Sequence, residues 1–379
     1  MKINWRSIPW AKNSFAALSA ACELSDITLH EVSSPENDIT CYSLNSVNEP
    51  PHFRDEISDA ECITIVGGPH PTACWEEVRQ YADYVVIGEG GEYTMPALIN
   101  MIASGSQILP AGVASKEQVV MPNHSVLLSS YPPFSVVKGG YTEISRGCPF
   151  GCGYCQTPRL CGRHMHHRRI DDIERATRVF RDVRFVTPNA LAYGSDGIHL
   201  RLDKVEQLFK SLTGRRIFFG TFPSEVRPEC ISDASLHLIE SYCANRKVHF
   251  GAQSGSNHVL QMLRRGHTAE DVMTAYDCCR DHGLTPIVDY IVGLPYESDD
   301  EQRLSVTQMK EISRGGGIVH VHHFTPLPGG TPLAGGTSAR SILPDVQREL
   351  GRLAQSGKAT GSWIDAEVRF FKEHEDQLS

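Results

Sequence analysis

The sequence predicts an α/β protein with two parts: a doubly wound parallel sheet near the N-terminus, followed by βα units that close wholly or partly into a barrel. Two observations carry this prediction. Short runs of β-branched and apolar residues recur along the chain, and most end in turns rich in glycine and proline. Stretches with helical spacing separate these runs, so consecutive strands are expected to pair in parallel. A chain of 379 residues can bury a core in each part.

The first part is expected to span residues 1–125. Its predicted strands cover residues 2–5, 38–44, 62–66 and 84–87, and its predicted helices cover residues 13–23 and 92–103. Two of the strands end in glycine-rich turns, Gly67-Gly68-Pro69-His70 and Gly88-Glu89-Gly90. Doubly wound sheets bind ligands beyond the carboxyl ends of their strands, where glycine lets backbone amides approach a phosphate. Either turn alone is a weak signal, since glycine often serves only to reverse the chain.

A linker and a barrel part follow. Residues 126–140 contain paired prolines and paired glycines, which favour an extended connection. The barrel part covers residues 141–335, and its six predicted strands lie at residues 142–145, 183–187, 216–219, 248–252, 287–292 and 318–324. Barrels of βα units place their chemistry at the carboxyl ends of the strands. The last segment, residues 336–379, is charged and helical in pattern, with Trp363, Phe370 and Phe371 as expected packing anchors.

Composition restricts the classes of function. No apolar run reaches the roughly 18–20 residues that cross a membrane, and the N-terminal residues contain no export signal. We therefore expect a cytoplasmic protein with no membrane partner, whose 12 scattered cysteines are reduced thiols. The net charge of −9 argues against a nucleic-acid partner. Basic residues gather between Arg159 and Arg169, where they could favour a reduced metal centre or receive an electron donor.

The strongest chemical signal is a set of three cysteines within eight residues, Cys148, Cys152 and Cys155, spaced C-x3-C-x2-C. Soft thiolates select iron–sulfur clusters, zinc or Cu(I). A cubane cluster normally takes four thiolates, so three would leave one iron open to an outside ligand. Spacing alone keeps structural zinc as an alternative, because Cys161 or a histidine between residues 164 and 167 could supply a fourth ligand.

This loop, with Tyr154 before its last cysteine, resembles the cluster loop of the radical S-adenosylmethionine (SAM) enzymes. Residues 251–267, 289–295 and 328–333 resemble later segments of that family, in the same order. The resemblance implies a partial (β/α)6 barrel, a [4Fe–4S] cluster on the three cysteines and SAM on the open iron. The residues that it implies for SAM binding are Tyr154, Asn189, Glu225, Gln253, Ser254, Arg265 and Ile291. Pro188-Asn189 departs from the Gly-Gly-Glu that relatives often carry there, and Glu225 could equally be a solvated loop carboxylate.

The glycine turns of the first part, within residues 66–77 and 83–99, together resemble the cobalamin-binding domain found upstream of many radical SAM modules. This resemblance implies cobalamin as a third cofactor. The residues expected to bind it are Ser7, Trp10, Gly67, Gly68, Pro69, His70, Gly88, Glu89 and Gly90. The D-x-H-x-x-G motif of other cobalamin-binding domains is absent after the first predicted strand. We therefore expect cobalamin to bind with its own base detached from the cobalt. The lower face of the cobalt would then be open or would face Trp10 or Lys12.

Together these resemblances imply a cobalamin-dependent radical SAM methyltransferase. A 5′-deoxyadenosyl radical would remove hydrogen from an unactivated sp3 carbon, and methylcobalamin would deliver the methyl group. The chain is most similar to compact archaeal members of the family. That similarity implies a protein or peptide substrate, namely the α-carbon of a glutamine in methyl-coenzyme M reductase. A ferredoxin or flavodoxin would supply electrons, and no catalytic side chain is identified.

Alternative functions stay open at this point. A small-molecule C-methylase, or a cobalamin-assisted radical SAM cyclase or rearrangement enzyme, would use the same site residues. A tRNA methylthiotransferase shares the barrel motifs, but it would be expected to carry a second cysteine-bound cluster upstream and an RNA-binding tail. Cys22, Cys41, Cys62 and Cys74 are not grouped as such a cluster requires.

Overall fold

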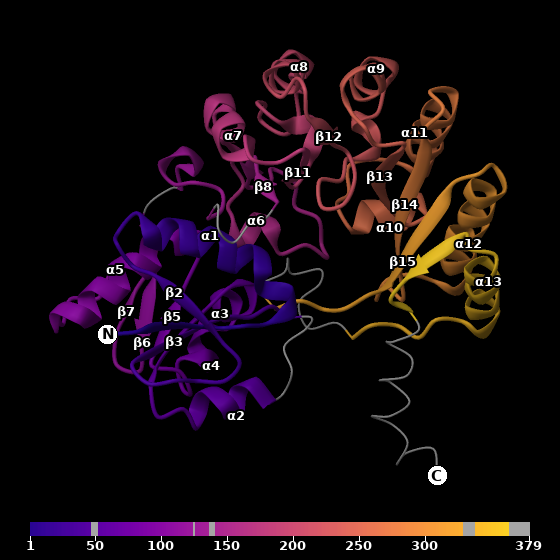
Figure 1. The fold of residues 1–379 in the computed structure, drawn as a ribbon. Helices are drawn as coiled ribbons and strands as arrows, with labels where there is room; N and C mark the ends of the chain where they lie inside the picture. The colour runs from indigo at the N-terminus through magenta and orange to yellow at the C-terminus, as the bar shows by residue number, and fades with distance from the viewer. Residues whose placement is uncertain (47–51, 124–125, 136–140, 329–337, 364–379) are drawn as a thin grey trace, which may run out of the picture. The chain divides into compact units, whose positions relative to one another are not determined.

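The computed structural model describes residues 1–46, 52–123, 126–135, 141–328 and 338–363 (Figure 1). The chain divides into two compact units. Unit 1 contains Met1–Cys148 and Gln156–Val186, and unit 2 contains Pro149–Cys155, Thr187–Pro326 and the described residues 338–363. The predicted division at residues 125 and 140 stays a prediction. Part of the expected linker, and most of the segment 328–333, lie outside the described residues.

Unit 1 is built on a seven-stranded sheet with the order β2-β1-β3-β4-β5-β6-β7. The strands are β1 Ile3–Arg6, β2 Leu29–Val32, β3 Ile39–Ser43, β4 Ile63–Gly67, β5 Tyr84–Val86, β6 Val113–Ser115 and β7 Val119–Val120. Strands β1 to β5 pair in parallel, as the sequence predicted, whereas β6 and β7 pair antiparallel. The prediction missed β2, β6 and β7, because all three are short and lie toward the edges of the sheet, where hydrophobic periodicity is weak.

Helices cover both faces of this sheet. α1 Lys12–Glu23 and α5 Gly91–Ser104 lie along one side, and α2 His52–Ser58 and α4 Trp75–Val78 lie along the other (Figure 1). α3 Pro69–Ala73 follows β4 directly. The central strand β3 is buried at every residue, and fully buried apolar side chains from β3, β4, β5 and α5 form the core. This arrangement confirms the doubly wound sheet and places the carboxyl ends of β1, β3, β4 and β5 at one edge.

The remainder of unit 1 begins the series of barrel strands. β8 Thr142–Glu143 pairs in parallel with β11 Asp182–Val186, and β9 Ser145–Arg146 pairs antiparallel with β10 His166–His167. The strand predicted over residues 142–145 is therefore two short strands. The helices of this segment are α6 Thr157–Leu160 and α7 Ile170–Thr177, and 3-10 turns lie at Pro9–Ala11 and Leu128–Ser130.

Unit 2 continues the βα series with a four-stranded parallel sheet, ordered β13-β14-β15-β16. The strands of unit 2 are β12 Arg216–Phe218, β13 Lys247–Gln253, β14 Thr285–Val292, β15 Ile318–His323 and β16 Ala359–Gly361. Its helices are α8 Leu202–Ser211, α9 Asp233–Tyr242, α10 Asn257–Met262, α11 Ala269–Asp281, α12 Asp299–Arg314 and α13 Pro344–Gln355, with 3-10 turns at Ala190–Ala192 and Pro228–Cys230. Capping boxes begin α9, α11 and α12, which fixes where each helix starts.

The two faces of the β13–β15 sheet differ sharply. One face carries Val248, Phe250, Val288, Tyr290, Val319 and Val321, all fully buried. Helices α11 and α12 contact β14 and β15, so this apolar face packs against helices. Strand alternation places polar side chains on the opposite face: His249, Gln253, Asp289, His320 and His322. That polar face positions the residues of the candidate site.

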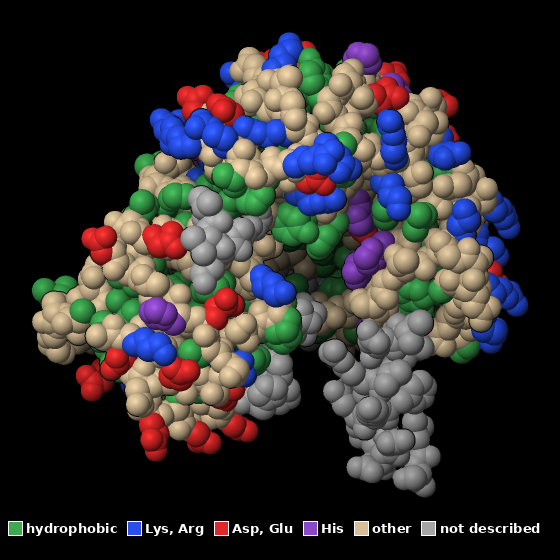
Figure 2. Space-filling view, viewed as in Figure 1, with side chains coloured by type: hydrophobic (Ala, Val, Ile, Leu, Met, Phe, Trp, Pro, Cys, Tyr) green, Lys and Arg blue, Asp and Glu red, His purple; other side chains and the backbone are tan. Residues whose placement is uncertain are grey.

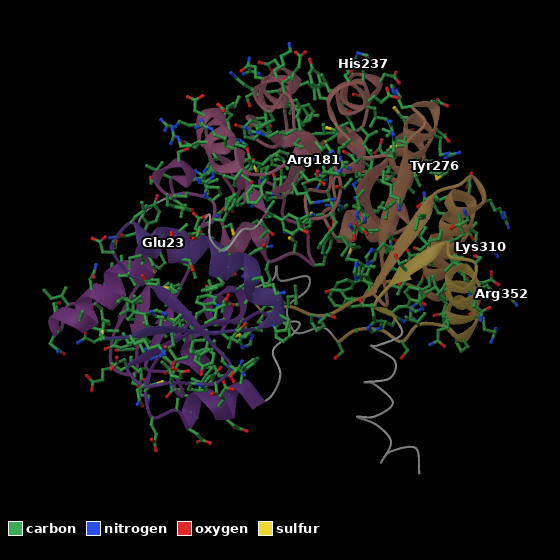
Figure 3. All side chains as sticks on the ribbon, in the orientation of Figure 1. Glu23, Arg181, His237, Tyr276, Lys310 and Arg352 are labelled. Carbon is green, nitrogen blue, oxygen red and sulfur yellow. The ribbon has the colours of Figure 1, made fainter. Side chains whose placement is uncertain are left out.

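The C-terminal segment corrects one expectation, because the described residues after 336 are not helical throughout. α13 is followed by β16, which pairs in parallel with β15. Lys310 of α12 and Arg352 of α13, both labelled in Figure 3, form ion pairs with Glu349, the first at 2.9 Å. Trp363 is buried, whereas Phe370 and Phe371 lie outside the described residues. None of the described helices is both long and apolar enough to span a membrane.

Candidate active site

The three cysteines of the C-x3-C-x2-C motif lie on a loop that leads from β9 into unit 2. Gly147, just before the loop, has a φ of +87°, a conformation that favours glycine. The amide of Cys148 donates to the carbonyl of Gly162 at 3.1 Å. The amide of Gly153 donates to the carbonyl of Leu263 at 2.9 Å. Backbone hydrogen bonds therefore hold the loop on both sides of Cys152.

Two guanidinium groups face the buried Cys152. Nη1 of Arg265 lies 3.6 Å from its Sγ, and Nη1 of Arg227 lies 3.8 Å from it. The Arg227 guanidinium stacks 3.6 Å from the centre of the Phe150 ring, and it also bonds to Oε1 of Glu229 at 2.5 Å. These contacts fix both positive charges at a position where a thiolate-bound cluster would bring negative charge. Sequence reasoning did not find Arg227, because no local motif marks it.

Four of the predicted SAM-binding residues gather near this loop. Tyr154 and Ile291 belong to one apolar cluster with Val259, Leu263, Leu294 and Phe324. Gln253 and Arg265 meet over Gly251: a Cβ at Gly251 would lie 2.0 Å from Nε2 of Gln253 and 3.0 Å from Nη2 of Arg265. Gln253 itself adopts a φ of +71°, which directs the chain away from the sheet at the end of β13. The structure thus brings an apolar surface and two polar side chains to the carboxyl ends of β13 and β14.

The other three predicted residues have different surroundings. Ser254 is fully buried and its hydroxyl lies 3.3 Å from that of Ser305, an internal packing contact. Nδ2 of Asn189 donates to Sγ of Cys230 at 3.3 Å. Glu225 is half-buried, and burial, followed by the charge of Asp289, raises the pKa of its carboxyl to about 7. This environment differs from that of a solvated loop carboxylate.

Unit 1 contains a cavity of about 460 Å³ at the carboxyl edge of its sheet. Side chains from β1, β3, β4, β5, α1 and α5 line it, together with Glu143, Arg146, Leu160, Cys161 and Val186. Five of the residues predicted to bind cobalamin are among its lining residues: Gly67, Gly68, Pro69, Gly88 and Glu89. Ser7, Trp10, His70 and Gly90 are not among them, and Trp10 is 38% exposed.

The floor of this cavity depends on two glycines. Gly68 has a φ of +110°, and a Cβ there would lie 2.5 Å from the carbonyl oxygen of Leu44. Gly88 has a φ of +92°, and its amide donates to Oγ1 of Thr72 at 3.1 Å. A Cβ at Gly88 would lie 3.0 Å from Cγ of Pro122, so close neighbours and positive φ angles favour glycine at both turns.

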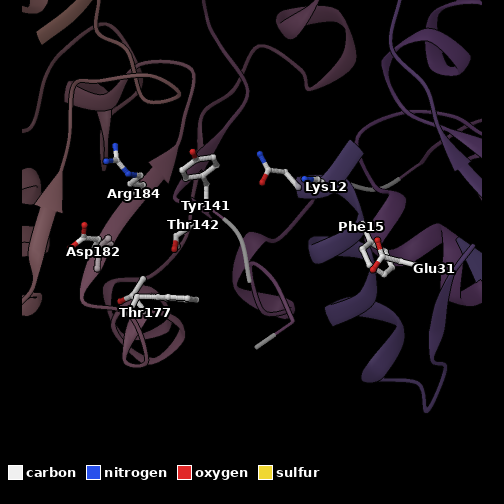
Figure 4. Close-up of a pocket in the computed structure, with 11 residues that line it drawn as sticks. Lys12, Phe15, Glu31, Tyr141, Thr142, Thr177, Asp182 and Arg184 are labelled. Atoms are coloured by element: carbon white, nitrogen blue, oxygen red, sulfur yellow. The ribbon is translucent and has the colours of Figure 1, made fainter. Parts of the chain in front are cut away.

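Lys12 lines a different cavity of unit 1, of about 590 Å³, together with Phe15, Glu31, Thr142 and Asp182 among others (Figure 4). Neither Trp10 nor Lys12 is thus among the residues that line the cavity at the carboxyl edge, where the sequence placed the cobalt. Among the described residues, its lining also includes no histidine. The lining of this cavity therefore does not support the expectation that Trp10 or Lys12 faces the lower side of the cobalt.

Comparisons with known proteins concern the fold and part of the sequence. Residues 142–305 match the model of the Radical SAM superfamily. The solved structure of the radical SAM methyltransferase TsrM from Kitasatospora setae, with cobalamin and a [4Fe–4S] cluster bound, has a TM-score of 0.64 at 15% identity, covering 88% of this chain and 77% of TsrM. OxsB, a cobalamin-dependent SAM radical enzyme with aqua-cobalamin and SAM bound, also has a TM-score of 0.64, at 16% identity, covering 88% of this chain and 54% of OxsB.

The relatives found by sequence comparison are named for a different reaction from that of the solved structures. The tRNA-2-methylthio-N(6)-dimethylallyladenosine synthase of Anaplasma phagocytophilum is 25% identical over 326 residues, which cover 80% of this chain and 68% of the relative. The enzyme of the same name from Pelotomaculum thermopropionicum is 26% identical over 284 residues, which cover 70% of this chain and 59% of the relative. The solved structures share the fold of most of the chain, whereas these relatives match its sequence at 25–26% identity.

Side chains within residues 142–305 suit the binding of an iron–sulfur cluster and of SAM. Nε of Arg265 is buried without a hydrogen-bond partner among the described residues, as is Oδ1 of Asn189. A buried guanidinium N–H without a partner suits the carboxylate of an amino-acid ligand. Three thiolates in one loop suit an iron–sulfur cluster with one open iron. The donor set therefore fits both groups.

Residues of the unit 1 cavity also fit cobalamin. Oε2 of Glu89 is buried and has no partner in the described part of the chain. Burial raises the pKa of this carboxyl, an effect that the charge of Arg146 opposes. The corrin ring carries amide side chains whose N–H groups could bond to such an oxygen. A glycine-floored cavity beside an unsatisfied acceptor is consistent with the predicted cofactor.

Sequence reasoning missed a buried ion-pair network beside this cavity. Arg146, the residue two before the first motif cysteine, donates to Glu92 at 2.6 Å and to Glu143 at 2.7 Å. It also donates to the carbonyl of Glu89 at 2.5 Å. The motif R-G-C places an arginine next to the cysteines, but only the fold shows that Glu92 of α5 is its partner.

We expect Arg146→Met to destabilise the protein by about 3–5 kcal/mol, because it leaves the buried carboxylate of Glu92 and the half-buried carboxylate of Glu143 without their counter-charge. Chemical denaturation of the purified protein measures this loss. The matched control is Arg169→Ala, which removes an exposed guanidinium from Asp172 while Arg175 still pairs with that carboxylate, so its loss should be much smaller. Equal losses in the two variants would contradict the assignment.

Glu297, in the loop after β14, predicts a pH-dependent stability. Burial raises the pKa of its carboxyl from 4.5 to about 8, although the Gly293 amide donates to its Oε2 at 3.2 Å. The folded state keeps the proton that the unfolded state releases above pH 4.5, so stability should fall as pH rises toward 8. Glu297→Gln should reduce this slope by about 1.4 kcal/mol per pH unit in that window. Denaturation at several pH values tests it, and an unchanged slope would refute it.

Proposed function

We propose that this chain is a cobalamin-dependent radical SAM methyltransferase that methylates an unactivated sp3 carbon. The observation that carries the proposal is the combination, in one chain, of a radical SAM domain and a glycine-floored cavity at the carboxyl edge of a separate doubly wound sheet. The fold shared with TsrM and OxsB, each over 88% of this chain, supports it.

The cofactors supply the difficult chemistry: when bound, the cluster and SAM provide a 5′-deoxyadenosyl radical that removes a hydrogen atom, and cobalamin provides the methyl group. The protein holds and shields these groups. Cys148, Cys152 and Cys155 would bind three irons, and Arg227 and Arg265 would balance the added negative charge. Arg265 would also bind the carboxylate of SAM, and Tyr154 and Ile291 would exclude water from its adenosyl part.

The acceptor that we propose first is a protein segment, namely the α-carbon of a glutamine in methyl-coenzyme M reductase. The proposal rests on the resemblance of this sequence to compact archaeal members of the family. A carbon of a small molecule is the alternative acceptor, and a cobalamin-assisted cyclisation or rearrangement is the alternative reaction. A ferredoxin or flavodoxin would deliver the electrons in each case.

A second candidate function is tRNA methylthiolation, which the 25% identity over 326 residues to a tRNA-modifying synthase favours. The cysteines upstream of the motif argue against it, because a second cluster would need thiolates there. Cys22 and Cys41 lie in the core of unit 1, and burial raises the pKa of Cys22 to about 12 and that of Cys41 well above its usual range. Cys22 and Cys41 thus pack as small apolar side chains of this core.

The test begins with anaerobic purification and reconstitution, followed by iron, sulfide, cobalt and zinc analysis. We expect about four irons and a single cobalt for each chain. The holoenzyme is then incubated with SAM, a reductant and either a glutamine-containing peptide of methyl-coenzyme M reductase or unmodified tRNA. Methylated peptide with 5′-deoxyadenosine and S-adenosylhomocysteine would support the proposal. Iron without cobalt, or methylthiolated tRNA, would overturn it, and zinc without iron would exclude radical chemistry at the cysteines.

A further inference from the structure

The polar face of the β13–β15 sheet carries a cluster of imidazole and carboxylate groups below the SAM-binding candidates. Asp289 of β14 is the direct register partner of His320 of β15. His249 of β13 lies on the same face, two residues before Gly251, which is the register partner of Asp289. Histidine side chains are visible over this sheet in the space-filling view (Figure 2). Three adjacent strands therefore each contribute one group to one place.

The three groups converge. Nε2 of His249 lies 2.8 Å from Oδ1 of Asp289, and a ligand atom of each of the three residues lies within 4.8 Å of the others. The rings of His249 and His320 stack with centres 5.9 Å apart, and those of His320 and His322 with centres 4.5 Å apart. His249 and Asp289 are buried, whereas His320 is half-buried and His322 is exposed, so the cluster is accessible from one side.

Among the three residues, His320 shows most clearly that the cluster has a nitrogen atom available to a ligand. It makes ring contacts, but no hydrogen bond of its imidazole is found among the described residues. Burial lowers its pKa, so its neutral form, with a free lone pair, is favoured. Glu225 adds a second carboxyl group nearby, whose pKa is raised by burial and by the charge of Asp289. The cluster thus combines an available imidazole nitrogen with two acidic side chains.

We propose that His249, Asp289 and His320 bind a divalent transition-metal ion. Two imidazoles and one carboxylate are a common ligand set for such ions, and they leave coordination positions open. Ligands at about 2.1 Å from a tetrahedral ion are separated by about 3.4 Å. The His249–Asp289 pair is close to that spacing, and His320 reaches it by a small rotation of its ring.

The position of the site suggests its use. Gln253 and Ile291 lie on the same strands and the same face, toward the carboxyl ends. An open coordination position would therefore lie on the side of the sheet that faces the proposed SAM site. It would take an oxygen or nitrogen donor of the substrate, such as an amide carbonyl, and hold it beside the radical. This use rests on the proposed function, whereas binding of the metal does not.

A second cluster in unit 2 provides a comparison. Asp233, Cys278 and His282 also bring ligand atoms within 4.8 Å of one another, on the outer helices α9 and α11. Asp233 is exposed there, and both ring nitrogens of His282 are already paired, with Glu240 at 2.8 Å and Asp233 at 3.2 Å. An outer cluster of this kind can pair internally without a metal, which makes it the matched control.

Zinc is the suitable probe, because neither an iron–sulfur cluster nor cobalamin contains it. Reconstituted holoenzyme is dialysed against micromolar Zn²⁺ in a weakly chelating buffer, and zinc, iron and cobalt are measured in the same sample. We expect a single zinc for each chain, with affinity reduced at least about 100-fold in His249→Ala and His320→Ala. His320→Cys should restore binding, since cysteine is itself a zinc ligand. Zinc K-edge absorption should show nitrogen and oxygen ligands at about 2.0–2.2 Å.

Three results would overturn the proposal: no bound zinc in the wild type, full binding in His320→Ala, or loss of zinc in His282→Ala with retention in His320→Ala. A variant in which Cys148, Cys152 and Cys155 are all alanine must also keep the zinc, since its loss would assign the ion to the cysteine loop. Circular dichroism checks the fold of each variant. The zinc measurement needs no SAM cleavage, so its failure and a failure of the methyltransferase assay are distinguishable.

Discussion

Replacement of Cys152 by alanine is expected to reduce SAM cleavage to background. Cys152 is buried between two guanidinium groups, with Nη1 atoms at 3.6 and 3.8 Å from its sulfur. Three thiolates are the minimum that holds a four-iron cluster with one open iron, so two cannot retain it. Iron should fall from about four atoms per chain to below one after reconstitution. The measurements are iron content, and 5′-deoxyadenosine formed with SAM and reductant.

Two other cysteines serve as controls for this variant. Cys161 lies in the cavity wall of unit 1, where burial raises the pKa of its thiol to about 12. Cys230 is buried, and burial raises its pKa to about 11. Both cysteines lie outside the C-x3-C-x2-C motif, so Cys161→Ala and Cys230→Ala should keep their iron and cleave SAM. SAM cleavage by the Cys152→Ala variant at the wild-type rate would contradict the assignment of the iron–sulfur cluster to this loop.

Much of the fold follows from the sequence because the central strands are strongly patterned. β3 and β14 are apolar runs buried within parallel sheets, and each stands out from the polar segments around it. α11 begins at a Thr268–Asp271 capping box, a local pattern of the kind that marks the start of a helix in a sequence. By contrast, β16 has three residues of weak strand character and forms only because β15 offers a free edge.

The candidate site was less predictable, because its groups come from distant parts of the chain. The cysteine spacing is local and could be recognised directly. Arg227 contacts Cys152 across 75 residues, and Arg146 contacts Glu92 across 54. His249, Asp289 and His320 converge only through the register of three strands. No periodicity within one segment can encode such partners, so they require the folded structure.

Gly68→Val is expected to reduce cobalamin retention at least about tenfold while leaving iron content unchanged. A Cβ at Gly68 would lie 2.5 Å from the carbonyl oxygen of Leu44, so the ends of β3 and β4 must move apart. The φ of +110° is also a conformation that β-branched residues avoid, at about 1–3 kcal/mol. Both effects act on the floor of the cavity, whereas the cysteine loop continues into the other compact unit. Cobalt and iron are measured after anaerobic gel filtration.

Gly105→Ala is the matched control for this prediction. Gly105 ends α5 with a φ of +69°, but nothing lies within 4 Å of a Cβ at that position. The substitution therefore also places a Cβ at a positive φ, with less backbone strain than at Gly68 and without any contact at the cavity, and it should keep cobalamin. Loss of cobalt in both variants would mean that destabilisation of unit 1 is sufficient to release the cofactor. Retention in both would show that the turn after β4 is not part of its binding site, because displacement of that turn must disturb any ligand that rests on it.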